Sequence, residues 1–187
     1  MADQGSEGLM SPYLRKKRFE AAESYLNGRV LDFGCGSGVL SAKVSAGNYV
    51  GVERDISSLE YARAQFPQHC FLSDLPDNTE KFDTIISLAV IEHVSDPASF
   101  LMMLAGYLND RQSSRIVITT PHPNVDWVHD LGAKIGLFSK HANDEHEDLL
   151  DKNKLQQAGV KAGLSLIEYK RFLYGANQLA IFSRSIS

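Results

Sequence analysis

The sequence has only two cysteines, no long apolar run and no excess of basic residues. The cysteines, Cys35 and Cys70, do not suggest a disulfide framework of the kind found in small secreted proteins. No apolar stretch approaches the roughly 20 residues that a membrane-spanning helix needs. The net charge of −4 gives no general attraction to a phosphate backbone, so we expect no nucleic-acid partner. These absences favour a cytoplasmic protein without membrane insertion.

Length and residue pattern bound the domain organisation. A chain of 187 residues has room for one domain with a sizeable core, and the sequence contains no internal repeat, low-complexity stretch or linker. Residues 1–10 are polar and acidic, and they lack the charged start and apolar middle of a signal peptide. We therefore predict a flexible N-terminal tail over residues 1–11 and a single domain over residues 12–187.

Short apolar segments alternate with helical ones along the chain. We expect helices at residues 12–26, 39–46, 57–64, 96–108 and 151–162, with Ser57, Asp96 and Asp151 at their starts, and strands at residues 29–33, 49–53, 70–72, 82–87 and 115–119. Apolar runs at 165–172 and 178–182 predict an antiparallel hairpin. This alternation indicates parallel β-α units with helices on both faces. The predicted fold class is α/β, a Rossmann-like, doubly wound, mostly parallel seven-stranded sheet with an antiparallel C-terminal hairpin.

A glycine-rich turn after the first predicted strand carries the clearest chemical signal. Asp32 and Phe33 are followed by Gly34-Cys35-Gly36-Ser37-Gly38, a G-x-G-x-G pattern. Glycines between a strand and a helix let the backbone approach a ligand closely, and a helix N-terminus favours polar or anionic groups. Glu53 ends the next strand 19 residues after Gly34, near the ~20-residue offset of an acid that binds ribose hydroxyls. The pattern predicts a nucleotide-type cofactor.

The spacing also distinguishes between cofactors. A dinucleotide fingerprint, G-x-G-x-x-G, would need a glycine where Val39 stands. Asp32, two residues before Gly34, would repel a pyrophosphate but suits the amino group of a methionine tail. The sequence therefore favours S-adenosylmethionine over a nicotinamide dinucleotide, and an oxidoreductase is disfavoured.

With three further segments, these residues resemble the class I S-adenosylmethionine-dependent methyltransferases over nearly the whole chain. The most specific matches are residues 30–38, 51–53, 73–75 and 82–97. The resemblance implies that Asp32 and the glycine-loop backbone hold the methionine part, that Glu53 binds the ribose, and that Asp74 binds the adenine amino group. The full set of implied cofactor residues is Asp32, Gly34, Cys35, Gly36, Glu53, Arg54, Asp74, Leu75 and Leu88.

Two parts of the resemblance concern the acceptor. The Ile-Glu-His-Val-x-Asp-Pro pattern at residues 91–97 is similar to ubiquinone-biosynthesis-type O-methyltransferases. Residues 120–123 and the Phe-x-x-Gly-x-Asn pattern at 172–177 look like bacterial methyltransferases of glycan synthesis. The implied acceptor is a small molecule or a saccharide, methylated at a hydroxyl oxygen.

Some relatives bind a divalent metal through E-x-x-E-H, and here Ala89 stands at the first position. One carboxylate ligand is therefore missing, and we expect no metal. Glu92 and His93 together with a distant histidine remain an alternative metal site. A structural role in the loop beneath the acceptor pocket is the other interpretation.

A hydroxyl acceptor must lose its proton, and a histidine suits that task near neutral pH. His93 and His146 are the catalytic candidates, with His122 as a third. His93 follows the fourth predicted strand, on the edge where open sheets bind ligands, and His146 lies in the irregular stretch 120–150. A structural hydrogen-bonding role is the alternative for each histidine.

Two other functions compete with a small-molecule methyltransferase. The chain could be a non-catalytic, methyltransferase-like binding or regulatory subunit, although Gly34, Gly36 and Glu53 are all present. Methylation of nucleic-acid amino groups is disfavoured, because residues 88–91 read Leu-Ala-Val-Ile in place of an N-P-P-Y-type tetrad.

Overall fold

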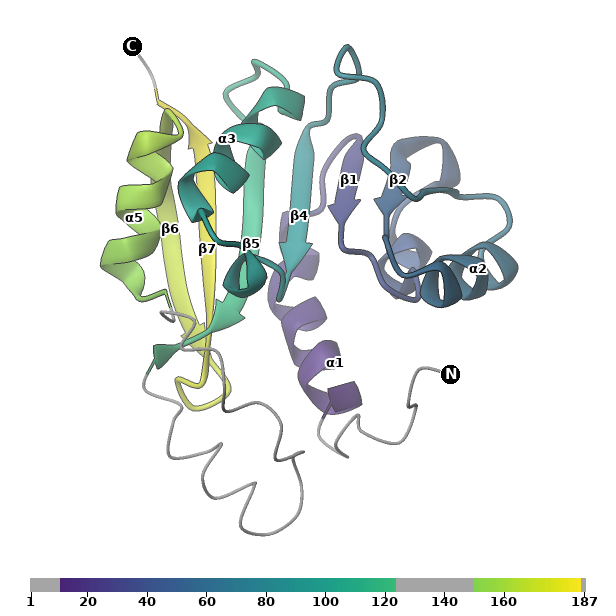
Figure 1. Ribbon diagram of the computed structural model, residues 1–187, viewed down its shortest axis with the longest axis horizontal. Coiled ribbons are helices and arrows are strands. Elements are labelled where there is room, and N and C mark those ends of the chain that lie inside the picture. Colours follow the sequence, from purple (N-terminus) through teal and green to yellow (C-terminus); the bar gives the residue numbers. More distant parts are fainter. Residues whose placement is uncertain (1–10, 124–149, 186–187) are drawn as a thin grey trace, which may run out of the picture.

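In the computed structural model, which describes residues 11–123 and 150–185, seven strands form one sheet in the order β3-β2-β1-β4-β5-β7-β6 (Figure 1). Strands β1 to β5 are parallel, and β7 runs antiparallel between β5 and β6. The predicted fold class is therefore confirmed. The strands are β1 Val30–Phe33, β2 Tyr49–Val52, β3 Cys70–Leu72, β4 Thr84–Leu88, β5 Arg115–Pro121, β6 Leu164–Phe172 and β7 Asn177–Arg184.

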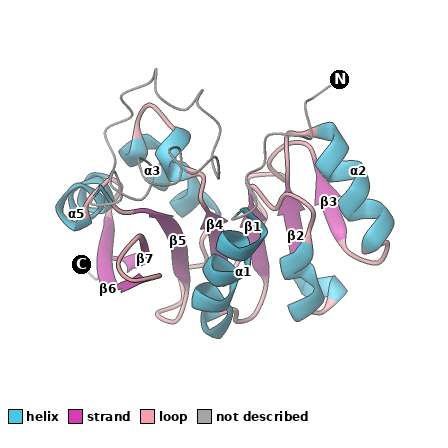
Figure 2. Cartoon of the chain, turned by 90° about the horizontal axis from the view of Figure 1, so that it is seen from below, coloured by secondary structure: helices cyan, strands magenta, loops and turns pink. Residues whose placement is uncertain are grey.

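Helices cover both faces of the sheet. Helices α3 (Pro97–Tyr107) and α5 (Lys152–Lys161) lie on one face, and α1 (Ser11–Ala22) lies on the other (Figure 2). Neighbouring strand residues point to opposite faces, so each strand contributes to two cores. Leu31 and Ile85 belong to the core under α3 and α5, while Val30 and Ile86 belong to the core under α1 and α2 (Ile56–Gln65). Such two-sided burial is expected of parallel strands.

Two helix starts follow the predicted capping residues. The Asp96 carboxylate accepts a hydrogen bond of 3.0 Å from the Ala98 amide, and Pro97 occupies the first turn of α3. The Asp151 carboxylate accepts one of 2.8 Å from the Lys154 amide at the start of α5. Each cap satisfies an amide that the helix itself leaves without a partner, which typically stabilises the helix by about 1 kcal/mol.

The predicted helix at residues 39–46 is wrong. This segment forms two 3-10 turns, η2 (Val39–Lys43) and η3 (Ala46–Asn48). Gly38, in front of η2, is left-handed with a φ of 74°, and Val44 after it is extended. The β-branched valines, Ser45 and Gly47 are all poor helix formers, so the short segment does not propagate an α-helix.

Ser57 is not the cap of α2, because the capping residue lies two positions earlier than predicted. Asp55 is the cap, and its carboxylate accepts a hydrogen bond of 2.8 Å from the Ser58 amide. Its extended backbone, with φ −70° and ψ 112°, leaves the side chain over the first helical turn.

The first predicted helix changes type before its end. It is an α-helix to Ala22 and then a 3-10 turn, η1 (Glu23–Tyr25), after which Leu26 is extended. The fourth strand begins at Thr84, two residues later than predicted, and Phe82 makes only a single bridge with Leu108. None of the helices within the described ranges combines the length and apolar character needed to cross a bilayer. Residues 1–10 of the predicted tail lie outside the described residues.

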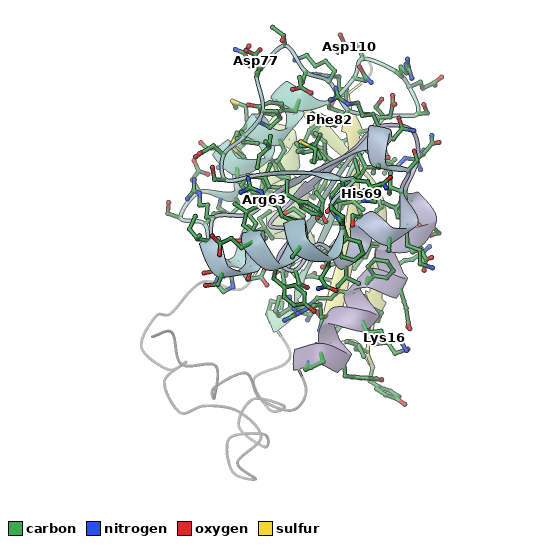
Figure 3. All side chains as sticks on the ribbon, turned by 90° about the vertical axis from the view of Figure 1, so that its right-hand side faces the viewer. Lys16, Arg63, His69, Asp77, Phe82 and Asp110 are labelled. Carbon is green, nitrogen blue, oxygen red and sulfur yellow. The ribbon has the colours of Figure 1, made fainter. Side chains whose placement is uncertain are left out.

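The side chains of Arg63 in α2 and His69 in the turn after it make hydrogen bonds to neighbouring backbone (Figure 3). The Arg63 guanidinium donates through Nε and Nη2 to the carbonyl oxygen of Phe71 in β3, at 3.2 and 2.8 Å. The ring Nε2 of His69 lies 2.9 Å from the carbonyl oxygen of Val44. These contacts join β3, α2 and the segment before β2 into one rigid border of the sheet.

Candidate active site

The four adjacent parallel strands β1 to β4 lie side by side in the sheet (Figure 1), and the predicted cofactor residues lie in or just after their carboxyl ends. Asp32 lies in β1 and the glycine loop follows it, Glu53 follows β2, Asp74 follows β3, and Leu88 ends β4. The chain leaves β1 towards β2 but enters β4 on the other side of β1, and ligands of open α/β sheets bind at such a switch point. The structure thus brings these residues to one edge of the sheet.

The glycine loop is shaped by two different requirements. Gly34 and Gly36 are both left-handed, with φ of 77° and 52°. A Cβ on Gly34 would lie 2.6 Å from Cγ2 of Val90, so the loop can pack against the segment after β4 only without a side chain there. A Cβ on Gly36 would meet no atom within 4 Å. Gly36 therefore borders open space.

The amides of the loop are already bonded within the protein. Those of Gly34 and Cys35 donate to the carbonyl oxygen of Val52 at 2.8 and 3.0 Å, and that of Gly36 donates to Glu53 at 2.9 Å. The following segment is only a short 3-10 turn, so the α-helix N-terminus expected from the sequence is missing. This loop is a poor anion site, which fits a cationic ligand better than a pyrophosphate.

Glu53 is held by two backbone amides. The Gly36 amide donates to Oε2 at 2.9 Å, and the Asp55 amide donates to Oε1 at 2.8 Å. Each carboxylate oxygen can accept a second hydrogen bond, so two acceptor positions remain for hydroxyl groups. Glu53 is half-buried and the next residue, Arg54, is exposed. The carboxylate is thus oriented before any ligand arrives.

Asp32 is a buried acid with one polar hydrogen-bond partner among residues 11–123 and 150–185. Its side chain is only 3% exposed, and the Tyr49 hydroxyl donates a 2.7 Å hydrogen bond to Oδ2. Gly51 is the β2 residue directly opposite Asp32, and a Cβ there would lie 3.0 Å from the Tyr49 hydroxyl and 2.8 Å from Sγ of Cys35. The missing side chain lets Tyr49 reach the acid, a contact that no pattern in the sequence reveals.

Burial shifts the titration of this pair and of the neighbouring thiol. Burial raises the pKa of Asp32 to about 7, against the hydrogen bond from Tyr49, while the nearby Glu53 charge adds to the increase. Burial likewise raises the pKa of the Cys35 thiol far above its usual range. Asp32 therefore changes charge near neutral pH, whereas Cys35 stays a neutral thiol and is no nucleophile.

The remaining predicted cofactor residues lie at the same edge of the sheet. Asp74 is exposed and accepts a 2.9 Å hydrogen bond from the Ser73 hydroxyl. Leu75 is half-buried against the core under α3, and Leu88 is half-buried against the core under α1. Their arrangement offers an exposed carboxylate beside apolar surface, which suits an adenine ring and its amino group.

The histidine predictions divide into three outcomes. His93 is exposed in the 3-10 turn η4 (Ile91–His93), on the predicted edge. His122 follows β5, its amide donates to the carbonyl oxygen of Ala176 at 3.0 Å, and burial together with Arg171 lowers the pKa of its ring. His146 lies outside the described residues. Within residues 11–123 and 150–185, no three His, Cys, Asp or Glu side chains are grouped as a metal site.

A set of polar residues around Glu92 is not apparent from the sequence. Glu92 Oε2 is buried and has no hydrogen-bond partner among the described residues, and the same is true of the hydroxyl oxygen of Thr120 in β5. Arg18 of α1 donates from Nε to Oδ1 of Asn177 in β7 at 2.9 Å, and its charge helps to ionise Glu92. Three of these four residues lie far from Glu92 in the sequence, so no spacing pattern could reveal the group.

The turn that carries Glu92 is strained and borders a cavity. Ala89, between β4 and η4, has a φ of 58°, which is unusual for a residue with a side chain. A cavity of about 680 Å³ lies between residues 91–98 and α5. Glu92, His93 and Asp96 line one side of it, and Lys161 lines the other. This volume is within the range of small-molecule sites.

Comparison with known proteins identifies the family. Residues 8–169 match the family model described as "Methyltransferase domain". The chain is 25% identical over 172 residues to the ubiquinone biosynthesis O-methyltransferase of Ruegeria pomeroyi, covering 85% of this chain and 69% of that protein. It is 26% identical over 151 residues to the enzyme of the same description from Aeromonas salmonicida, covering 73% and 62%. The chain thus spans about two thirds of the length of these relatives.

Solved structures show the same fold. Magnesium protoporphyrin IX methyltransferase from Synechocystis, solved with bound S-adenosylhomocysteine, superposes with a TM-score of 0.71 at 17% identity, covering 97% of this chain and 90% of that one. A methyltransferase described as TehB-like from Corynebacterium glutamicum gives a TM-score of 0.64 at 16% identity, covering 90% and 87%. The resemblance seen in the sequence is confirmed. The chain belongs to the methyltransferase domain family, and its cofactor is S-adenosylmethionine.

Proposed function

We propose that this protein transfers the methyl group of S-adenosylmethionine to a hydroxyl oxygen of a small-molecule or saccharide acceptor. The observation that carries the proposal is the fixed position of Glu53. Its two oxygens are bonded to the Gly36 and Asp55 amides, at the sheet edge where the glycine loop borders open space. A carboxylate oriented in this way accepts hydrogen bonds from both ribose hydroxyls without reorganising.

The donor and acceptor groups of the edge fit this cofactor. The methionine part carries an ammonium group, and the Asp32 carboxylate and the loop carbonyl oxygens attract a cation. We assign Asp32 and residues 34–36 to that part, Glu53 with Arg54 to the ribose, and Asp74 with Leu75 to the adenine. Leu88 contributes apolar surface beside the cofactor. A dinucleotide is disfavoured, because the three loop amides that could donate to its phosphates already donate within the protein and the Asp32 carboxylate would repel them.

The cofactor supplies an activated methyl group on a sulfonium ion, and the protein supplies position. Holding two reactants in line removes the entropic part of the barrier, which is worth up to about 7–11 kcal/mol in well-oriented systems. The contact between Gly34 and Val90 contributes to this positioning, because it packs the glycine loop against the turn that leads to η4. The same turn carries the acceptor side of the site.

The acceptor class rests on similarity. The relatives named above are described as O-methyltransferases, which favours oxygen as the methylated atom. The saccharide option rests on the patterns at 120–123 and 172–177 and stays a prediction. His93 lines the cavity next to α5, so an acceptor bound there could pass its proton to the ring. His146 keeps its proposed role as a second candidate.

A methyl-transfer assay tests the proposal. Purified protein would be incubated with methyl-labelled S-adenosylmethionine and, separately, with catechol, methyl glucoside, aniline and a simple thiol. We expect label in a hydroxyl-bearing probe, and none with Glu53→Ala. Label only in the amine or thiol would show that the acceptor class is wrong. Cofactor binding without transfer to any probe would favour the non-catalytic subunit.

A further inference from the structure

Asp32 is a buried acid whose surroundings supply no positive charge within the described part of the chain. It is 3% exposed, and no cation is among the described groups that shift its pKa. Burial and the Glu53 charge both oppose its ionisation. A buried carboxylate in a folded protein is normally paired with a cation. The environment of Asp32 therefore suits a cationic ligand.

Tyr49 reaches this acid from the start of the neighbouring strand. It is the first residue of β2, two residues before Gly51, which is paired with Asp32. Residues i and i+2 of a strand share one face, so the tyrosine side chain extends along β2 over Gly51. The hydroxyl donates to Oδ2 of Asp32 at 2.7 Å, and a Cβ on Gly51 would lie 3.0 Å from the hydroxyl oxygen. Gly51 thus keeps this path open.

Aromatic contacts fix the position of the Tyr49 ring. His69 and Phe71 both contact it edge-on, each with its ring centroid 5.6 Å away. His69 is itself held, because its Nε2 lies 2.9 Å from the carbonyl oxygen of Val44. Tyr49 is 1% exposed, so its ring is enclosed by these neighbours. Its hydroxyl therefore holds the Asp32 carboxyl group in a fixed orientation.

Among the described residues, the other neighbours of Asp32 do not donate to its carboxyl group. Ile86, which is paired with it on β4, is apolar. Burial keeps the Cys35 thiol neutral, and its sulfur contacts the glycine position on β2. Glu53 carries the same charge, and both of its oxygens accept backbone amides. Tyr49 is thus the side chain that orients this acid.

We propose that Tyr49 is a positioning residue for the cofactor, and that the ammonium group of the cofactor displaces a proton from Asp32. The inference rests on the assignment of Asp32 to the methionine part in the proposed function. The Tyr49 hydroxyl occupies Oδ2, so the proton of the neutral acid lies on Oδ1, which is also the oxygen left for the ammonium.

The exchange is a competition between two cations for one oxygen. Burial raises the pKa of Asp32 to about 7, so much of the ligand-free protein carries the proton near neutral pH. On binding, this proton passes from Oδ1 to solvent and the ammonium donates to the same oxygen. No covalent bond of the cofactor changes. A ligand that lacks the ammonium group leaves the proton in place.

Proton release on binding tests the inference without turnover. Calorimetric titrations at pH 7 in two buffers of different ionisation enthalpy give the number of protons released. The probe is S-adenosylhomocysteine, and the control ligand is 5′-methylthioadenosine, which has the nucleoside and the thioether but no amino-acid part. We expect release of about half a proton with the probe, because a group with a pKa of about 7 is half protonated at pH 7. We expect none with the control ligand.

Tyr49→Phe removes the donor and keeps the ring. A hydrogen bond to an ionised group is roughly twice as strong as a neutral one, so its loss should lower the acid dissociation constant of Asp32 by roughly 10- to 100-fold. Release at pH 7 should then rise to about one proton, and the Kd for S-adenosylhomocysteine should rise roughly 5- to 50-fold. The matched control is Tyr61→Phe on α2, where the tyrosine is 56% exposed, and it should behave like the wild type.

Asp32→Asn should release no proton, and release that persists in this variant would contradict the exchange. Equal release with the two ligands, which needs no variant, would also overturn the inference, as would equal release by folded Tyr49→Phe and the wild type. Circular dichroism checks that each variant is folded. Binding of S-adenosylhomocysteine without proton release contradicts the inference alone, whereas no binding by the folded wild type contradicts the cofactor assignment beneath it.

Discussion

The Tyr49 hydroxyl donates a 2.7 Å hydrogen bond to the buried carboxyl group of Asp32, in the space left by Gly51. This contact places a partly neutralised acid directly before the glycine loop. Burial raises the pKa of Asp32 to about 7, so its charge depends on pH in the range where the protein is handled. The consequences differ for cofactor binding and for folding.

Cofactor affinity should increase as pH rises through 7. The ionised carboxylate attracts the ammonium group of S-adenosylmethionine, and the neutral acid does not. Below pH 7 we expect the Kd to rise by about tenfold per pH unit, because binding must then ionise Asp32. Calorimetric titrations from pH 5.5 to 8.5 measure this, with Asp32→Asn expected to bind weakly and without the pH dependence. A flat profile for the wild-type protein would disprove the role of Asp32.

The same acid should make the ligand-free protein less stable as pH rises. The pKa of Asp32 is about 7 in the folded protein and 3.8 ordinarily, so protonation of this carboxyl group favours the folded state. Its contribution to the free energy of unfolding is fully present below pH 3.8 and is lost as pH rises through about 7. Over that window the effect reaches roughly 4 kcal/mol at most. Asp32→Asn should therefore gain free energy of unfolding over the wild type as pH rises from 5 to 8, measured by urea denaturation. An equal difference at both pH values would argue against a buried, titrating Asp32.

Gly34 and Gly36 should respond differently to alanine. Gly34→Ala places a Cβ 2.6 Å from Val90 and also strains a φ of 77°, so we expect a loss of about 2–4 kcal/mol in unfolding free energy. Gly36→Ala meets no protein atom, so we expect about 1 kcal/mol from its φ alone. Its methyl group enters the ligand space, so cofactor affinity should fall at least ~10-fold. Urea denaturation and calorimetry compare the two, and a larger stability loss for Gly36→Ala would contradict the assignment.

We expect Asp83, which lies outside the candidate active site, to stabilise the folded protein. It is buried and accepts hydrogen bonds from the Arg29 amide at 3.0 Å, Asn109 Nδ2 at 2.8 Å and Arg111 Nη1 at 3.0 Å. The Arg29 amide is the main cause of its lowered pKa, so its contribution to stability is present above its ordinary pKa and is lost as pH falls.

We expect Asp83→Ala to lose about 2–4 kcal/mol near pH 7, because its donors are left without acceptors. The matched control is Asp110→Ala, whose exposed carboxylate pairs with Arg184 on the surface and should contribute less than about 1 kcal/mol. Thermal and urea denaturation measure both. Equal losses for the two variants would show that the Asp83 hydrogen bonds contribute little.

Much of the fold could be predicted because its signals are local. The Asp96-Pro97 pair and Asp151 are capping residues in the sequence, and they are caps in the structure. The predicted helix at 39–46 is wrong because it relied on the spacing of apolar residues alone. That spacing does not show that Gly38 is left-handed or that the residues around Val44 have a low helix propensity. The predicted start of α2 is wrong because Asp55 and Ser57 are both good capping residues, and in the structure Asp55 has the extended backbone of a cap and accepts the Ser58 amide.

The candidate site could be predicted only where it depends on distance along the chain. Glu53 is predicted from its offset to Gly34. The contact between Tyr49 and Asp32 depends on the pairing of β1 with β2, which sets Gly51 opposite the acid. The group of Arg18, Glu92 and Asn177 joins α1, η4 and β7, and only the folded sheet brings these elements together.

The most direct test of the central claim is a calorimetric titration of the protein with S-adenosylmethionine, alongside Glu53→Ala and Glu60→Ala. Glu53→Ala leaves the ribose hydroxyls without their acceptor, which should weaken binding by about 1–3 kcal/mol, or roughly 5- to 150-fold. Glu60→Ala, an exposed glutamate on the next helix, should bind like the wild type. Micromolar binding that weakens only in Glu53→Ala is the predicted result. Equal affinity in all three proteins, or no binding by the folded wild type, would contradict the account.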